Sequence, residues 1–272
     1  MKKQVLMWIL FAVFLWGLPL SAYADKVRIE VDGKRVADLG ASTLVEDEIW
    51  VPLRELSIPF GMEFSRWDKE TETLTVCTPH VTVIAQVGDQ WLTANGVCFP
   101  VQGEVLGCRG GVLVPLDVLC SVFDASWYRE GGNRAEVTIS DAPKIPDASI
   151  YDPEDLYWLS RIVYAESGGE SFECQLAVAE VVLNRVESEW YPDDVYGVVF
   201  DQENGVQFTP TENGSIYNEP SEESIAAAKL ALGGSQTMPD DVLFFVSTLI
   251  GPNWVSEART FVMQIGITDF YA

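Results

Sequence analysis

Hydrophobic positions follow three different patterns along this chain. Residues 5–20 form a nearly continuous apolar run. Between residues 26 and 139, apolar and polar residues mostly alternate, which is typical of half-buried strands. From Leu156 to Val186 the apolar residues recur every three or four positions, which is typical of helices that bury one face. The pattern therefore predicts an α+β protein with a leader, a β-rich region and a helical region.

The apolar run at the start has the features of an export signal. Lys2 and Lys3 precede it, and residues 22–24 (Ala-Tyr-Ala) form an A-x-A cleavage site. Because the run is short for a membrane span and contains Gly17 and Pro19, we expect residues 1–24 to be removed. The mature chain then begins at Asp25, is exported and has no membrane span. An uncleaved anchor is the alternative.

The β-rich region contains an internal repeat. Residues 51–76 align with residues 114–139 at a constant offset of 63, and both segments begin with Val-Pro-Leu. Each predicts a short helix followed by a hairpin, and the stretches 26–36 and 81–92 before them predict further hairpins. We therefore expect a duplicated small strand–helix–hairpin unit whose two copies superpose.

Residues 140–155 are rich in Pro, Asp and Ser, which is typical of a joint between domains. Asp152 and Pro153 have the residue types of an N-cap and a first helical position. The sequence thus predicts an N-terminal domain over 25–141, a linker over 142–154 and a C-terminal domain over 155–272.

The first helix of the C-terminal domain carries an acid on its apolar face. Leu156, Leu159, Val163 and Glu166 share one side of the helix. Residues 167–169 (Ser-Gly-Gly) permit a tight reversal, and a second apolar helix from about Ser171 should pack back on the first. Partial burial would raise the pKa of Glu166, as a general acid requires. The alternative is a glutamate that turns out to solvent.

Composition excludes several functional classes. The chain has 272 residues and a formal net charge of −24 without any run of Lys or Arg, so it should repel nucleic acid. One histidine and no Cys/His cluster disfavour a zinc site or a Ser-His-Asp unit, and we expect neither metal nor cofactor. An oxidising compartment would permit one or two disulfides. The cysteines that could form them are Cys77, Cys98, Cys108 and Cys120, whereas Cys174 is expected to be a buried apolar residue.

The repeat resembles the copper amine oxidase N-terminal-like domain of secreted bacterial proteins. The resemblance lies in the Val-Pro-Leu-Arg of residues 51–54 and the Trp67-Asp68 pair, of which the second copy lacks the Arg and the Asp. Copper ligands are missing. The resemblance implies a spacer or a wall-binding module, and a structural domain without ligand is the alternative.

Residues 155–271 resemble the SleB-type cell wall hydrolase family. The longest matching motif spans 159–188, and shorter ones lie at 197–210, 224–234 and 265–272. The resemblance implies a mainly helical, lysozyme-like fold with a small β element, peptidoglycan glycan strands as the substrate, and Glu166 as the catalytic acid. Two departures are Thr268 where the family has His, and residues 167–170 (Ser-Gly-Gly-Glu) where Ala-Arg-Gly-Glu is common.

The expected function is therefore glycan-strand cleavage by a secreted, wall-associated lytic transglycosylase with Glu166 as its single acid. Plain hydrolysis and non-catalytic wall binding are the alternatives. The choice between spore cortex and vegetative wall, the protein partners and the oligomeric state stay open. The candidate substrate-binding residues are Gln207, Phe208, Tyr164, Tyr217 and Trp254, with core packing as the alternative for each aromatic. Glu170 and Glu173 are possible second acids, with a favourable position at the start of the next helix as the alternative. Glu180 is expected at the surface or in a supporting position, and Asn184 and Arg185 could support the site.

Overall fold

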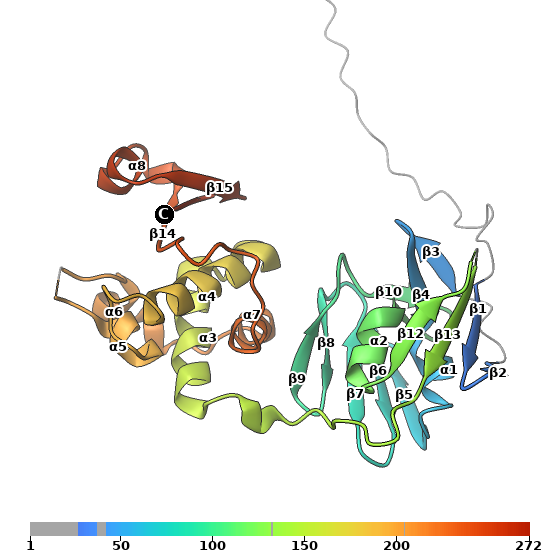
Figure 1. Cartoon of the computed structure of the whole chain (residues 1–272). Helices are drawn as coiled ribbons and strands as arrows, with labels where there is room; N and C mark the ends of the chain where they lie inside the picture. Colours follow the sequence, from blue (N-terminus) through green and yellow to red (C-terminus); the bar gives the residue numbers. More distant parts are fainter. Residues whose placement is uncertain (1–26, 37–41, 132, 204) are drawn as a thin grey trace, which may run out of the picture.

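The computed structural model describes residues 27–36, 42–131, 133–203 and 205–272. The predicted leader and its cleavage site lie outside these residues. The described residues form a β-rich N-terminal body and a mainly helical C-terminal body, joined by an extended segment (Figure 1). None of the helices in these residues is long and apolar enough to cross a membrane.

The N-terminal body consists of short strands and two short helices that follow the alternating pattern of the sequence. Its elements are β1 (Arg28–Val31), β2 (Lys34–Arg35), β3 (Thr43–Val45), β4 (Glu48–Pro52), α1 (Leu53–Ser57), β5 (Phe64–Asp68), β6 (Thr73–Cys77), β7 (Thr82–Gln86), β8 (Trp91–Ala94), β9 (Val97–Pro100), β10 (Leu106–Cys108), β11 (Gly111–Pro115), α2 (Leu116–Val122), β12 (Ser126–Arg129) and β13 (Arg134–Thr138). Residues 51–76 include α1, β5 and β6, and residues 114–139 include α2, β12 and β13.

These strands form three sheets, with orders β12-β13-β1-β2, β10-β11-β4-β3 and β5-β6-β7-β8-β9. The β1–β13 pair is parallel, and the other pairs in these sheets are antiparallel. Val51 of β4 lies opposite Val114 of β11. The two repeat segments therefore meet at equivalent positions in the middle of one sheet.

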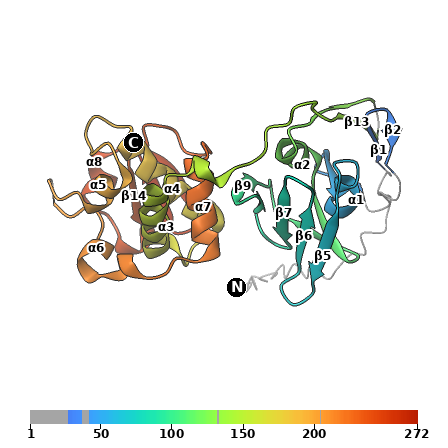
Figure 2. The ribbon, with the colours of Figure 1, turned by 90° about the horizontal axis from the view of Figure 1, so that it is seen from below.

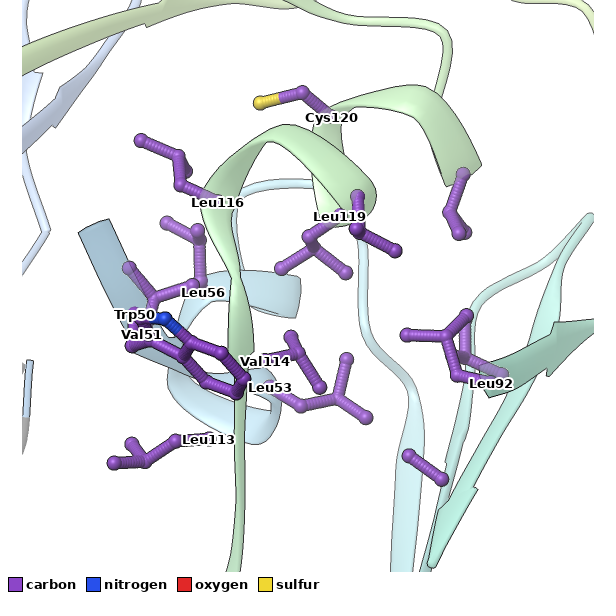
Figure 3. Close-up of a cluster of buried hydrophobic side chains, with 14 of the residues drawn as sticks. Trp50, Val51, Leu53, Leu56, Leu92, Leu113, Val114, Leu116, Leu119 and Cys120 are labelled. Carbon is purple, nitrogen blue, oxygen red and sulfur yellow. The ribbon is translucent and has the colours of Figure 1, made fainter. Parts of the chain in front are cut away.

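The core of the N-terminal body gathers the same residues from both segments. Leu53 and Leu56 of α1 lie in one buried cluster with Leu116 and Leu119 of α2 (Figure 3). The rings of Phe60 and Phe123, which are also equivalent at the offset of 63, stack with centroids 4.4 Å apart. Because each unit offers one apolar helix face, packing the two faces together buries both.

The C-terminal body is built from helices and one small antiparallel sheet of order β14-β16-β15. Its elements, with the short helix that precedes them, are η1 (Ala148–Ile150), α3 (Pro153–Ser167), α4 (Phe172–Val186), α5 (Val195–Phe200), α6 (Pro210–Asn213), η2 (Ser215–Tyr217), α7 (Glu222–Leu232), β14 (Phe244–Ser247), η3 (Thr248–Ile250), α8 (Trp254–Ala258), β15 (Phe261–Ile265) and β16 (Thr268–Tyr271). The stretch 240–251, which is apolar enough in the sequence to suggest a buried strand throughout, contains the short strand β14 followed by the single turn η3.

Helix α4 is buried on nearly every side, which differs from the single apolar face expected of it. Val178, Ala179, Val181 and Val182 point in different directions around the helix, yet all four are inaccessible. The reason is that α4 packs against α3, α5, α7 and β14 at once. Cys174, as predicted, lies fully buried in this core.

The two bodies are in direct contact through the β8–β9 hairpin. Trp91 at the start of β8 packs on Phe172 at the start of α4, with ring centroids 4.8 Å apart. Lys229 of α7 donates to the Gly96 carbonyl oxygen at 3.0 Å. Figure 2 shows β9 at the edge of the β-rich body that faces α7. The N-terminal body is therefore docked on the helical body rather than merely tethered to it.

All five cysteines are free thiols in the structure. Cys98 is buried between the two bodies, where its backbone N–H donates to the Tyr151 hydroxyl at 3.1 Å. Burial raises the pKa of the Cys98 thiol to about 11 and that of Cys120 to about 12. The structure thus shows none of the disulfides that export would permit.

Candidate functional site

Helix α3 places Glu166 at its end, where two helices meet. The Asp152 side chain accepts hydrogen bonds from the backbone N–H groups of Glu154 and Asp155, and Pro153 occupies the first turn, as predicted. Glu166 is the penultimate residue of α3 and remains partly exposed. Its carboxyl group makes no hydrogen bond with the described residues. The Glu166 carboxyl group is therefore partly accessible and is not used to hold the fold together among the described residues.

The turn after Glu166 depends on a glycine. A side-chain Cβ at Gly168 would lie 2.5 Å from the Tyr164 carbonyl oxygen and 2.6 Å from the Tyr164 ring. No backbone carbonyl can be approached so closely, so the sequence needs glycine there. Tyr164, a predicted substrate contact, thus covers the turn that follows Glu166.

Burial raises the pKa of Glu166 above its usual value, while the positive charge of Arg185 acts in the opposite direction. The apolar stripe of α3 predicts the first of these effects. A glutamic acid with a raised pKa keeps its proton closer to neutral pH, so it can donate that proton to a leaving group.

Arg185 lies on α4 in an almost closed environment. It is 5% exposed, and its Nε donates to the Leu243 carbonyl oxygen at 2.8 Å. Its guanidinium carbon lies 5.1, 5.0 and 5.9 Å from the ring centroids of Tyr191, Phe208 and Phe244. Its neighbour Asn184 donates to the carbonyl oxygens at 239 and 242, so both residues fasten α4 to the segment before β14.

Phe208 has a different role from the one predicted. It is 2% exposed and belongs to the core of the helical body. A ring without exposed surface cannot stack on a sugar, so the predicted substrate contact is wrong, and Phe208 instead supports the Arg185 guanidinium. Its neighbour Gln207 stays partly exposed, and the Gln207 amide donates to the Gly205 carbonyl oxygen at 3.1 Å.

Tyr217 belongs to a separate aromatic surface. It is 62% exposed, and its ring lies 6.2 Å from that of Trp158, which also contacts Tyr196 and Phe200. Trp158 precedes Glu166 by eight residues, or about 12 Å along α3 at 1.5 Å per residue. Tyr217 therefore lies beside the first half of α3, whereas Glu166 lies at the end of that helix.

Trp254 is on the small-sheet side of the helical body. It is 62% exposed at the first position of α8, and its ring meets Phe244 edge-on at 5.7 Å. Phe244 in turn contacts the Arg185 guanidinium. Trp254 is thus linked to the surroundings of Glu166 through two intermediate side chains.

The other acids have distinct surroundings. Glu180 is buried, and its carboxylate accepts from the Thr237 and Met238 backbone N–H groups and from the Thr237 hydroxyl, at 2.7 to 3.0 Å. Glu173 is exposed in the first turn of α4. A Cβ at Gly266 would lie 3.0 Å from a Glu170 carboxylate oxygen, so the β15–β16 turn lies beside the α3–α4 turn. Glu180 is therefore a structural residue.

Within the ranges that the structure describes, no group of three or more His, Cys, Asp or Glu side chains is placed to hold a metal ion. A cavity of about 880 Å³ lies between α4, the end of α7 and Leu243, and neither Glu166 nor Arg185 lines it. Arg185 is the feature that sequence reasoning undervalued, because nothing in a sequence indicates that an arginine is buried without a full set of partners.

Comparison with known proteins adds two family matches. Residues 169–271 match the family described as Cell Wall Hydrolase, and residues 26–139 match the Copper amine oxidase N-terminal domain. The first match begins just after Glu166. However, α3, which carries Glu166, packs against α4 and α7 and so forms part of the same body.

Several spore cortex-lytic enzymes are similar to the C-terminal half. The chain is 32% identical over 135 residues to that of Oceanobacillus iheyensis, which covers 50% of this chain and 47% of the relative. It is 31% identical over 116 residues to that of Bacillus subtilis, covering 43% and 37%. The chain thus spans less than half the length of these curated relatives.

Two solved catalytic domains are also similar. One is the catalytic domain of the germination-specific lytic transglycosylase SleB from Bacillus anthracis, with 30% identity and a TM-score of 0.41, covering 47% of this chain and all of that one. The other is the catalytic domain of the Bacillus cereus SleB protein, with 31% identity and a TM-score of 0.41, covering 45% and 92%.

Proposed function

We propose that the protein cleaves the glycan strands of peptidoglycan at muramoyl–glucosaminyl linkages, because residues 169–271 match the Cell Wall Hydrolase family and the C-terminal half is similar to spore cortex-lytic enzymes. The observation that carries the proposal is the partly buried acid at the end of α3, whose pKa is raised by burial and whose carboxyl group has no structural partner among the described residues. The names of the relatives favour spore cortex as the substrate.

In the proposed reaction Glu166 acts twice. It first gives its proton to the glycosidic oxygen as the bond from that oxygen to the anomeric carbon breaks. The resulting carboxylate then takes the proton of the muramoyl 6-hydroxyl as its oxygen bonds to the anomeric carbon. The product is a 1,6-anhydro end, and Glu166 regains its proton. One carboxyl group suffices for both steps, whereas most glycosidases use two.

Support for this reaction over simple hydrolysis comes from the surroundings of Glu166. Glu180 is bound to the loop before β14, and Glu173 is exposed on the first turn of α4.

For the substrate contacts we retain the exposed candidates. Trp254 contacts Phe244, and Phe244 contacts Arg185. Gln207 is the chain neighbour of Phe208, which also contacts Arg185. Tyr164 covers the turn that follows Glu166. Tyr217 would contact the glycan farther along α3. Substituting Trp254 by Ala should weaken sedimentation with sacculi.

For the N-terminal body we propose a duplicated unit that serves as a fixed wall-facing support. The offset of 63 relates not only α1 to α2 but also β1 to β8 and β3 to β10, by their bounds. Its contact with α4 and α7 supports a fixed position rather than a free spacer.

The decisive experiment replaces Glu166 by Gln in the exported chain. Gln keeps the size but carries no exchangeable acidic proton, so activity on purified cortex and on vegetative sacculi should fall about 10²- to 10⁴-fold. Glu173→Gln, a matched exposed glutamate on the next helix, should retain activity. Mass spectrometry should find 1,6-anhydromuramoyl ends in the wild-type digest.

Other outcomes separate the alternatives. Reducing ends in place of anhydro ends would keep Glu166 as the acid but establish hydrolysis. Near-full activity of Glu166→Gln would transfer the role to Glu170 or Glu173. A wild-type protein that sediments with sacculi but cleaves neither substrate would be a wall-binding protein.

A further inference from the structure

Arg185 is the only Lys or Arg with a fully buried side chain among the residues that the structure describes. Removing a charge from water is costly unless the charge finds partners. Arg185 has few. Its Nε is paired with the Leu243 carbonyl oxygen, but its Nη1 has no hydrogen-bond partner within the described ranges. A buried cation with an unused donor indicates that the charge itself is needed at this place.

The rest of the side chain is fixed. Rings from three different segments, Tyr191, Phe208 and Phe244, lie around the guanidinium group within 6 Å. Cation–π contacts hold such a group without using its N–H donors. The unused Nη1 is therefore held in position for another acceptor.

Three titratable groups act electrostatically on Arg185, namely Tyr191, Glu166 and Asp201. Tyr191 already contributes its ring face, and an Asp201 oxygen accepts the backbone N–H of Glu203 at 2.9 Å. The carboxyl group of Glu166 has no hydrogen bond of its own with any described residue. Glu166 is thus the acceptor that lacks a partner, as Arg185 Nη1 is the donor that lacks one.

We propose that Arg185 is a positioning residue for Glu166, and that its free Nη1 pairs with the Glu166 carboxylate once Glu166 has given its proton to the leaving sugar. This inference rests on the proposed function. A protonated acid needs no ion pair, whereas the carboxylate formed during bond cleavage does. An interaction that strengthens as charge develops lowers the barrier rather than only tightening binding.

The pairing also prepares the second step. A carboxylate held by one Nη1 keeps its other oxygen for the proton of the 6-hydroxyl, so the proton that Glu166 donated is restored from that hydroxyl. Phe208, buried beneath the guanidinium, keeps Arg185 from turning away during this exchange.

The test uses the full exported chain with Arg185→Met, which keeps the length of the side chain but removes its charge. The matched control is Arg161→Met, because Arg161 also has a buried Nε without a partner among the described residues but lies over Tyr157 and is paired with Glu219. Two quantities are measured: the pKa of Glu166, by carbon-13 NMR with Glu166→Gln to assign the signal, and the pH dependence of kcat.

In Arg185→Met the pKa of Glu166 should rise, because the opposing positive charge is gone. The alkaline limb of the pH profile of kcat should therefore move to higher pH. The plateau value of kcat should fall about 10- to 100-fold, and KM should change less than about threefold. Arg185→Lys should recover part of both losses. Arg161→Met should leave the pKa of Glu166 unchanged.

A folded Arg185→Met variant with an unchanged Glu166 pKa and an unchanged pH profile would overturn the proposal, even if its activity were low. If Arg185→Met does not fold, Arg185→Lys decides, since wild-type pKa and kcat in that variant would exclude a role for the guanidinium group. If the wild type has no activity at all, the proposed function fails, while the NMR titration still tests the pairing of Arg185 with Glu166.

Discussion

Asp89 should make the stability of this protein depend on pH. It lies in the β7–β8 connection and lines a cavity of about 450 Å³ between the two bodies. Glu222 and Glu223 from the first turn of α7 and Glu104 line the same cavity. Burial raises the pKa of Asp89 from 3.8 to about 6, and the negative charges of Glu222 and Glu223 add to the effect.

The sign follows from proton binding. The folded protein binds the Asp89 proton more tightly than the unfolded chain, so folding is penalised as the solution pH rises above the unfolded pKa of 3.8, and the penalty levels off above the folded pKa. The penalty is absent below about pH 4, grows between pH 4 and 6, and is complete above. The difference in pKa corresponds to about 3 kcal/mol, and solvent screening at this half-buried group reduces it to about 1–2 kcal/mol.

The perturbation is Asp89→Asn, which imitates the protonated form at every pH. Calorimetry should show Tm raised by about 3–6 °C at pH 7.5 and unchanged at pH 4. Glu104→Gln is the control: Glu104 lines the same cavity, but its charge does not contribute to the raised pKa of Asp89. This substitution should therefore shift Tm much less. An equal shift of Tm at both pH values, or none at pH 7.5, would refute the reasoning.

Three further substitutions test how the helical body is held. Gly168→Ala should cost about 1–3 kcal/mol, seen as a lower Tm, because the added carbon meets Tyr164, whereas Gly169→Ala meets nothing within 4 Å and serves as its control. Gln175→Met should lower the free energy of unfolding, measured by urea denaturation, by about 1–3 kcal/mol, because the Glu170 carbonyl oxygen and the Ser224 hydroxyl would lose their hydrogen-bond partner. Glu180→Gln should speed hydrogen exchange at the backbone amides of Thr237 and Met238, because both amides donate hydrogen bonds to the Glu180 carboxylate.

Much of α3 and α4 could be predicted because the signals are local. Asp152 and Pro153 start α3, and Ser171, whose hydroxyl accepts the Cys174 N–H at 3.3 Å, starts α4 near the expected position. Side-chain caps and glycine turns act within four residues, so a sequence displays them directly. The partial burial of Glu166 follows from the same local stripe.

The surroundings of Glu166 could not be predicted in the same way. Phe208 and Arg185 lie 23 residues apart in the chain and face each other because the whole body closes around them. An aromatic in a polar, glycine-containing loop has the same local pattern whether it faces a sugar or the core. Burial of this kind is decided by packing between distant segments, which periodicity does not report.

The docking of the two bodies shows how a repeated unit can acquire different surfaces. Under the proposed duplication, β8–β9 corresponds to β1–β2, so Trp91 stands where the first copy has Arg28, and Cys98 where it has Arg35. Arg28 remains half-exposed and pairs with the buried Glu30, whereas Trp91 and Cys98 pack against the helical body. An exposed charged hairpin and an apolar one can share a backbone, because both turns use residues with positive φ, at 32–33 and at 95–96. The two positions are arginine in the first hairpin and apolar in the second. This difference explains why the second hairpin anchors the N-terminal body beside α4, the helix that carries Arg185, and the first does not.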